Sequence, residues 1–194
     1  MKLAGIILSA GESSRMGRDK ALLPYQGSTF LNHIISQFVS RLDPVVVVLG
    51  HHAGQIQSSL RAPPRLRVVI NDHYKLGMLS SLQEGIRALP DGVEAGMFTL
   101  VDHPTVGAAT LDRLISEWER TRAALVIPRL GERRGHPVIA SRAILGEMLT
   151  LPSGASPKSV VGRHREQTLF VGVHDAGVLR DIDLPSDFDA IESR

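Results

Sequence analysis

Short apolar runs alternate with longer amphipathic segments along this chain. Each run is short enough to be a strand, and polar or turn-forming residues bound it. Because the runs contain few polar residues, they are typical of strands that are buried on both faces of a sheet. The predicted buried strands are Leu3–Leu8, Val45–Leu49, Leu66–Ile70, Ala95–Val101, Leu125–Pro128 and Leu169–Val173.

The segments between these strands carry the spacing of helices. Phe30, Ile34 and Phe38 recur at every fourth position, which puts them on one buried face of a helix. Alternating strands and helices predict an α/β fold in which helices cover both faces of a mostly parallel sheet. Ligands of such sheets bind beyond the carboxyl ends of the strands. The predicted helices are about Thr29–Ser40, Ala53–Leu60, Met78–Leu89, Ala108–Arg122 and Ser141–Leu149.

The composition predicts a single domain over residues 1–194, with 43% hydrophobic and 22% charged residues. No apolar run approaches the roughly 20 residues that a membrane span needs. Met1-Lys2-Leu3 leads directly into a strand, so we expect neither a signal peptide nor a membrane partner. The absence of cysteine excludes disulfides and thiolate metal sites and fits a cytoplasmic protein. A net charge of only +2 argues against a nucleic-acid partner.

The first predicted strand ends in a turn of small residues, Ser9-Ala10-Gly11. Cations follow the turn at Arg15, Arg18 and Lys20. The backbone N–H groups of such a turn, together with nearby cations, suit a polyanion and above all a triphosphate. The Walker A loop does not fit, because five residues separate Gly11 from Gly17 and no Lys follows at once.

The dinucleotide-binding fingerprint does not fit either. It requires a second glycine two residues after the first and an acidic residue at the end of the next strand. Gly11 has no such partner, and the next strand runs into His51-His52. Two adjacent histidines are open to a metal or acid/base role, but we expect them to be solvent-exposed loop residues.

The segment from Leu3 to Leu23 resembles the signature of the nucleotidyltransferases, in which Gly, Ser-x-Arg-Met-Gly and Lys wrap a nucleoside triphosphate. It is most similar to the MobA-like branch, which attaches a nucleotide to molybdopterin. The resemblance implies a Rossmann-like fold of the nucleotide-diphospho-sugar transferase type. It implies that Arg15 and Lys20 neutralise the triphosphate as catalytic residues. The nucleotide-binding residues that it implies in this segment are Leu8, Ala10, Gly11, Arg15 and Lys20.

The segment from Asn71 to Leu82 is similar to a family run that lies against the nucleotide base. Gly77 permits a tight turn, and a serine at a helix start either caps the helix or offers its hydroxyl to a ligand. Both roles stay open from the residues alone. The resemblance implies further contacts to base and ribose from Asn71, Gly77, Met78, Ser80 and Ser81.

Asp102 stands at the tip of the predicted strand Ala95–Val101 and is followed by His103-Pro104. A carboxylate there suits Mg²⁺, which takes one or two carboxylates and shares phosphate oxygens of the substrate. The same residue could instead cap the next helix. The resemblance implies that Asp102 is a catalytic metal ligand, that Asp183 is the second ligand, and that Mg²⁺ is the cofactor. Leu184 and Ser186 depart from the Thr and Glu that are usual in the family.

The segment from Arg129 to Arg142 predicts a hairpin tipped with positive charge, which fits an anionic acceptor or a solvated turn. Its Gly135-His136-Pro137 matches a family motif, so the resemblance implies acceptor binding by His136 and Arg134. This motif and Ser9-Ala10-Gly11 favour the cytidylyltransferase-like branch over the guanylyl branch. The family's Gly-Asp-x-Gly-Ala-Arg run is not matched at Pro152–Lys158, where the acidic residue is missing.

The resemblance implies transfer of a nucleoside monophosphate from an NTP, with CTP favoured, to an anionic phosphorylated small molecule, with molybdopterin favoured. An ionised phosphate of the acceptor attacks the α-phosphorus and pyrophosphate leaves, so no strong general base is needed. A guanylyltransferase, a sugar-phosphate nucleotidyltransferase and a non-catalytic nucleotide-binding regulator or chaperone remain alternatives. A molybdoenzyme or a chaperone is the protein partner that the resemblance suggests.

Overall fold

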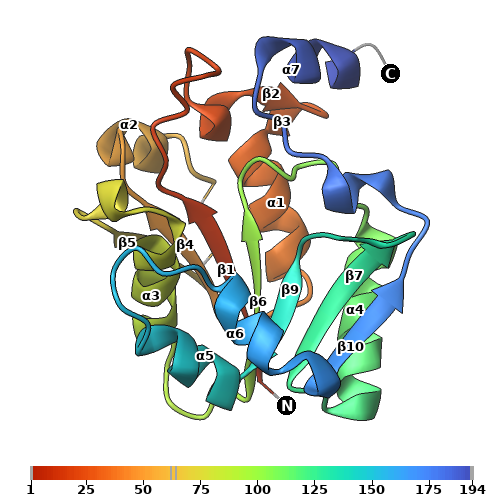
Figure 1. Cartoon of the computed structure of the whole chain (residues 1–194). Helices are drawn as coiled ribbons and strands as arrows, with labels where there is room; N and C mark the ends of the chain where they lie inside the picture. The colour runs from red at the N-terminus through yellow and green to blue at the C-terminus, as the bar shows by residue number, and fades with distance from the viewer. Residues whose placement is uncertain (1, 62, 64, 193–194) are drawn as a thin grey trace.

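A mixed, mostly parallel sheet of eight strands forms the centre of the computed structural model, which describes residues 2–61, 63 and 65–192. The strand order is β10-β7-β9-β6-β1-β4-β5, and β8 pairs with β7. This architecture confirms the predicted α/β fold (Figure 1). The strands are β1 (Leu3–Ser9), β4 (Val45–Leu49), β5 (Leu66–Ile70), β6 (Ala95–Leu100), β7 (Leu125–Leu130), β8 (Arg133–Arg134), β9 (Val138–Ser141) and β10 (Thr168–Gly172).

The strands β1, β4, β5 and β6 are mutually parallel, as are β7 and β10. The strand β9 runs antiparallel between β6 and β7. It was not predicted, because its apolar run is only three residues long and passes directly into the next helix. The predicted hairpin is present, since β7 and β8 pair antiparallel. A second, two-stranded sheet joins β2 (Pro24–Tyr25) to β3 (Ser28–Thr29).

The five predicted helices are present, and none of their ends differs from the prediction by more than two residues. Thr29 accepts a hydrogen bond from the Asn32 amide and so caps the first of them. Two further helices were not predicted, because they are too short to show a clear periodicity. The helices are α1 (Phe30–Val39), α2 (Ala53–Ser58), α3 (Met78–Arg87), α4 (Ala108–Thr121), α5 (Arg142–Leu149), α6 (Lys158–Arg163) and α7 (Pro185–Glu192), with short 3-10 helices η1 (Lys20–Leu22), η2 (Tyr74–Leu76), η3 (Arg165–Gln167) and η4 (Ala176–Leu179).

The two faces of the sheet carry separate hydrophobic clusters. On β1, Leu3 and Ile7 face the cluster under α1, α2 and α4, whereas Ile6 and Leu8 face the cluster under α3, α5 and α6. Figure 1 shows α5 and α6 in front of the sheet and α4 behind it. The helix α3 packs closely on β1, because a Cβ at Gly85 would lie 2.5 Å from the Ile6 side chain. These contacts hold β1 rigidly at the centre of the sheet.

The strand β5 differs from its prediction as a buried strand. Its residues are half-buried or exposed, and Ile70 is 49% exposed. The reason is its position, since β5 is the last strand at one edge of the sheet and pairs only with β4. An apolar run alone does not distinguish a central strand from an edge strand.

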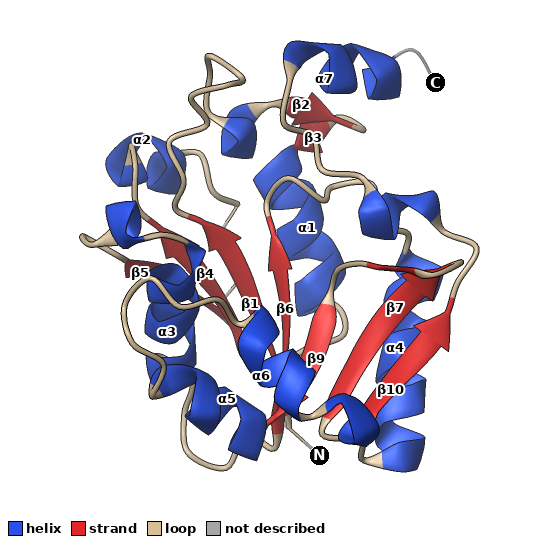
Figure 2. Ribbon diagram, in the orientation of Figure 1, coloured by secondary structure: helices blue, strands red, loops and turns tan. Residues whose placement is uncertain are grey.

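A third hydrophobic cluster joins the C-terminal segment to the turn after β1. The α7 residue Phe188 packs with Phe30 of α1 and with Met16 and Leu23. The amide of Ile182 donates to the backbone oxygen of Asp102, with a donor–acceptor distance of 2.9 Å. These contacts place the C-terminal segment over the carboxyl ends of the central strands (Figure 2).

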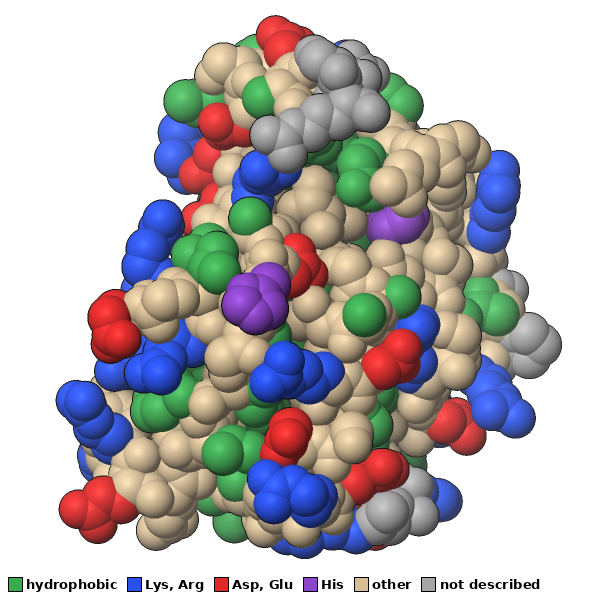
Figure 3. Space-filling view, turned by 90° about the vertical axis from the view of Figure 1, so that its right-hand side faces the viewer, with side chains coloured by type: hydrophobic (Ala, Val, Ile, Leu, Met, Phe, Trp, Pro, Cys, Tyr) green, Lys and Arg blue, Asp and Glu red, His purple; other side chains and the backbone are tan. Residues whose placement is uncertain are grey.

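The surface carries charges of both signs. On the face shown in Figure 3, Lys and Arg side chains are interspersed with Asp and Glu side chains. Among the described residues, no helix combines the length and the apolar character that crossing a membrane requires.

Candidate active site

A cavity of about 350 Å³ opens at the carboxyl ends of β1 and β6, and we call it the central cleft. It is lined by the turn after β1, by the start of α3, by the end of β6 and by Asp183 of the C-terminal segment. Both predicted aspartates line it. So do all five residues predicted in the N-terminal segment, Leu8, Ala10, Gly11, Arg15 and Lys20.

The turn after β1 has a fixed backbone shape. Ser13 has a φ of 52° and Gly17 a φ of 72°, so both adopt the left-handed conformation. The backbone oxygen of Ser13 accepts hydrogen bonds from the amides of Met16 and Gly17 at 3.0 and 3.2 Å. Its hydroxyl accepts another from the Lys20 amide at 3.2 Å. Because Met16 is buried in the third cluster, this turn is anchored and returns the chain to the cleft at Lys20.

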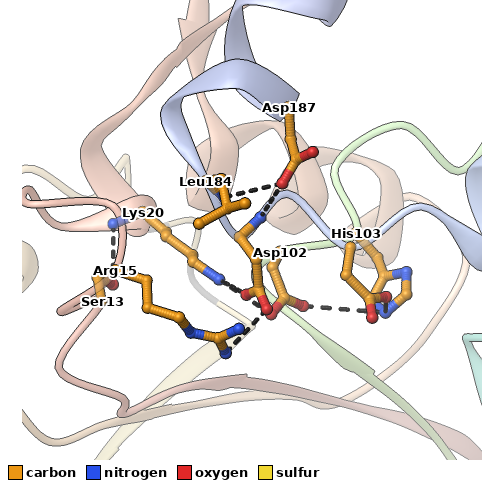
Figure 4. Close-up of polar contacts among 9 residues, drawn as sticks. Ser13, Arg15, Lys20, Asp102, His103, Leu184 and Asp187 are labelled. Atoms are coloured by element: carbon orange, nitrogen blue, oxygen red, sulfur yellow. Dashed lines mark hydrogen bonds and ion pairs between the residues drawn. The ribbon is translucent and has the colours of Figure 1, made fainter.

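The two predicted metal ligands, Asp102 and Asp183, both contact the ammonium group of Lys20 (Figure 4). The Lys20 Nζ atom lies 3.4 Å from Oδ2 of Asp102 and also donates to Oδ1 of Asp183. A guanidinium nitrogen of Arg15 lies 2.8 Å from Oδ2 of Asp183. The Lys20 side chain is 10% exposed, so little water competes with the carboxylates for its ammonium group. The structure therefore brings together residues that lie far apart in the sequence, while their roles as ligands stay predictions.

Both carboxylates have the chemistry of ligands for a hard cation. The hydrogen bond from Lys20 is the main cause that lowers the pKa of Asp183, and the charge of Arg15 adds to it, so this carboxylate is ionised at neutral pH. The Oδ1 atom of Asp102 is buried and accepts no hydrogen bond from the described residues, and the Nε2 atom of His103 lies 3.8 Å from it, beyond hydrogen-bond distance. A buried carboxylate oxygen without a donor is costly unless a cation pairs with it. Oxygen ligands of this kind suit Mg²⁺ or Mn²⁺.

Two of the residues predicted to contact the base, Asn71 and Ser80, are not among the residues that line the cleft, and their contacts stay predictions. Asn71 is 2% exposed, and its amide donates to the hydroxyls of Ser80 and Ser81 at 2.9 and 3.0 Å. The hydroxyl of Ser80 donates to the backbone oxygen of Gly77 at 2.8 Å. Asn71 and Ser80 therefore hold the start of α3 in place behind the wall of the cleft. The other three predicted residues of this segment line the cleft, namely Gly77, Met78 and Ser81.

A second cavity of about 900 Å³ adjoins the central cleft, and Met78 and Leu100 line both. The predicted acceptor residues His136 and Arg134 line this second cavity. Lys158 lines it too, although it belongs to the run in which the family motif is not matched. The position of Lys158 follows from α6, which the sequence pattern did not reveal. Two adjoining cavities match a reaction between two substrates.

A pair of histidines, His103 and His136, lines the second cavity. The Nε2 atom of His103 lies 2.9 Å from a carboxylate oxygen of Asp181, and its ring centroid lies 5.0 Å from that of His136. Burial is the main cause that lowers the pKa of His136 to about 4, and the nearby His103 contributes. His136 is therefore neutral at physiological pH and would contact an acceptor by hydrogen bonding rather than by charge.

Folding stability should depend on pH through His136. Its pKa is about 4 in the folded protein, against an ordinary value of 6.5. Between these values His136 binds a proton in the unfolded chain more readily than in the folded protein. The free energy of unfolding is therefore at its full value above pH 6.5, and it decreases as the pH falls towards 4. We expect wild type to lose about 2 to 3 kcal/mol more unfolding free energy than His136→Gln over this window. Urea unfolding at both ends of the window measures the difference, and parallel curves for the two proteins would contradict it.

Several other residues that line the central cleft were not predicted as functional, Ser13, Asp19 and Tyr74 among them. Ser13 and Asp19 lie inside the recognised N-terminal segment, and Tyr74 is the aromatic residue of the Asn71–Leu82 run. Their motif positions were visible in the sequence. That their side chains reach the cavity depends on the left-handed turn and on η2, which no periodicity indicates.

Comparisons with known proteins identify the family of this chain. Residues 5–168 match the MobA-like NTP transferase domain. The molybdenum cofactor cytidylyltransferase of Escherichia coli (strain K12) is 26% identical over 191 residues, covering 97% of this chain and 95% of that protein. The probable molybdenum cofactor guanylyltransferase of Bacillus cereus (strain AH187) is 34% identical over 145 residues, covering 72% of this chain and 68% of that protein.

Solved structures share the whole fold. A Mycobacterium tuberculosis H37Rv protein in complex with manganese superposes with a TM-score of 0.82 at 26% identity, covering 100% of both chains. The domain match covers most of the chain, and the cytidylyltransferase relative matches along nearly its whole length. The chain therefore belongs to the MobA-like NTP transferase family and is a nucleotidyltransferase.

Proposed function

We propose that this protein transfers the cytidylyl group of CTP to a terminal phosphate of molybdopterin in the cytoplasm, with Mg²⁺ as the cofactor. One observation carries the proposal: Asp102 and Asp183 both contact the Lys20 ammonium group. All three residues line the cleft that the turn after β1 also lines. The second cavity, with His136, Arg134 and Lys158, supplies room for the acceptor next to the nucleotide.

The residues of the cleft suit this reaction. An acceptor phosphate oxygen forms a bond to the α-phosphorus of CTP, the bond to the β-phosphate breaks, and pyrophosphate leaves. Lys20 and Arg15 neutralise the triphosphate, and the backbone N–H groups of the β1 turn orient it. Asp102 and Asp183 would hold Mg²⁺, which polarises phosphoryl oxygens when it is bound. The structural relative that was solved with manganese supports a divalent cation in this fold.

The cytidylyl assignment rests on two sequence features, Gly135-His136-Pro137 and Ser9-Ala10-Gly11. Coverage does not separate the two activities, because the cytidylyltransferase relative is 26% identical over 97% of this chain and a further guanylyltransferase relative is 30% identical over 98% of it. Guanylyl transfer is therefore the second candidate, and the guanylyltransferase relatives have the higher identities, up to 34% in the Bacillus cereus protein.

Thermal unfolding with each of CTP, GTP, ATP and UTP, with and without Mg²⁺, tests the nucleotide. We expect CTP with Mg²⁺ to raise the melting temperature most, since a ligand at 100 times its Kd adds about 2.7 kcal/mol of stability. A larger shift with GTP would instead support guanylyl transfer. Pyrophosphate release with molybdopterin as acceptor tests turnover. Nucleotide binding without pyrophosphate release would indicate a non-catalytic binder.

A further inference from the structure

A second cluster of potential metal ligands lies at the rim of the central cleft. Asp19, His51 and His52 each offer one ligand atom, and these atoms all lie within 4.8 Å of one another. Asp19 precedes η1 and lines the cleft, whereas the two histidines follow β4. Two segments far apart in the sequence thus bring two imidazoles and one carboxylate together, outside the Asp102–Asp183 pair.

The spacing of these atoms suits one ion. The Nδ1 atom of His52 lies 3.0 Å from Oδ2 of Asp19. Neighbouring ligands of a tetrahedral ion that each lie at roughly 2.0–2.2 Å from it are about 3.3 Å apart. The ring centroids of His51 and His52 are 3.7 Å apart, so both rings lie on the same side of the loop. Small side-chain shifts would therefore let all three groups reach one ion.

The cluster is held in place by its surroundings. The Nδ1 atom of His51 lies 3.2 Å from the Tyr74 hydroxyl, which fixes the ring and leaves Nε2 for an ion. Metal-binding histidines commonly have such a partner on the second ring nitrogen. The amide of His51 donates to the backbone oxygen of Ala10 at 3.1 Å, which ties the loop after β4 to the turn after β1. His52 has a φ of 49°, a left-handed conformation that is uncommon for residues other than glycine.

We propose that Asp19, His51 and His52 bind one transition-metal dication of the Zn²⁺ class. Two imidazole nitrogens and a carboxylate suit Zn²⁺, Co²⁺ or Ni²⁺, whereas Mg²⁺ prefers oxygen ligands alone. Three protein ligands leave a fourth position open. The site is therefore different in ligand chemistry from the Asp102–Asp183 pair, and the proposal does not depend on the nucleotide or the acceptor.

Metal binding to the whole protein without nucleotide tests this proposal. Calorimetric titration with ZnCl₂ alone should show one tight ion per chain, and Co²⁺ alone should give the visible absorption of a four-coordinate ion. We expect Asp19→Asn and His52→Asn each to weaken Zn²⁺ binding by more than about 100-fold. Loss of an outer partner costs about 10- to 100-fold, so Tyr74→Phe should weaken it less than either ligand variant.

Two controls separate this site from other metal contacts. His174→Ala removes an exposed histidine outside the cluster, and Asp102→Asn removes a carboxylate of the other site. Both should keep the Zn²⁺ affinity within about twofold. Asparagine is chosen at position 52 because it tolerates a positive φ, and melting curves in metal-free buffer check that each variant folds. Unchanged Zn²⁺ affinity in folded His52→Asn would overturn the proposal and leave the Asp19–His52 contact as an ion pair only.

Discussion

Replacing Asp102 with asparagine should lower kcat at least about 1000-fold, which corresponds to about 4 kcal/mol of lost transition-state stabilisation. The amide keeps the size of the side chain but removes one of the two charges that would hold the divalent cation. A Lewis-acidic cation contributes several kcal/mol to reactions in which charge develops on phosphoryl oxygens. Pyrophosphate release at saturating CTP, acceptor and Mg²⁺ measures the effect.

The fold of Asp102→Asn should stay intact. The backbone oxygen of Asp102, which accepts from the Ile182 amide, is unchanged by the substitution. The matched control is Asp112→Asn on α4, where the carboxylate is 59% exposed and lies 2.6 Å from Arg41. This control should keep its kcat within about twofold. If folded Asp102→Asn retained more than about a tenth of the wild-type kcat, the assignment of Asp102 as a metal ligand would be wrong.

The central part of the fold was predictable because burial leaves a direct trace in the sequence. Strands such as β1 and β4 are apolar throughout, since helices cover both faces of the sheet. The helix α1 shows its buried face in every turn. The strand β9 and the helices α6 and α7 show no comparably long apolar or periodic pattern in the sequence. They are short, and their formation depends on tertiary contacts.

The sequence likewise predicted some features of the candidate site and not others. Local motifs were sufficient to find the β1 turn and both aspartates. That Asp183 reaches Lys20 depends on Phe188 and the third cluster, which fix the C-terminal segment through contacts between distant parts of the chain. The contacts of Asn71 were not predictable either. An asparagine before a helix can face a ligand or hold the backbone, and the sequence does not show that the Asn71 amide donates to Ser80 and Ser81.

Replacing Lys20 with glutamine should change catalysis and metal binding in opposite directions. A positioned cation or donor at a developing charge contributes about 100- to 1000-fold, so kcat/KM should fall by that factor. Without nucleotide, however, the ammonium itself neutralises Asp102 and Asp183 (Figure 4). It therefore competes with a divalent cation for the same oxygens. Removing it should raise the affinity for Mn²⁺ added alone, whereas Asp102→Asn should lower that affinity.

A Mn²⁺ titration of the nucleotide-free protein distinguishes these outcomes. Lys2→Gln is the matched control, because Lys2 is exposed and immediately precedes β1, at the end of the strand opposite the cleft. It should leave both kcat/KM and Mn²⁺ affinity unchanged. A lower Mn²⁺ affinity in Lys20→Gln would mean that the ammonium positions the carboxylates for the ion rather than competing with it. A higher affinity combined with lost turnover would mean that Lys20 leaves the carboxylates when the nucleotide binds and then pairs with its phosphates.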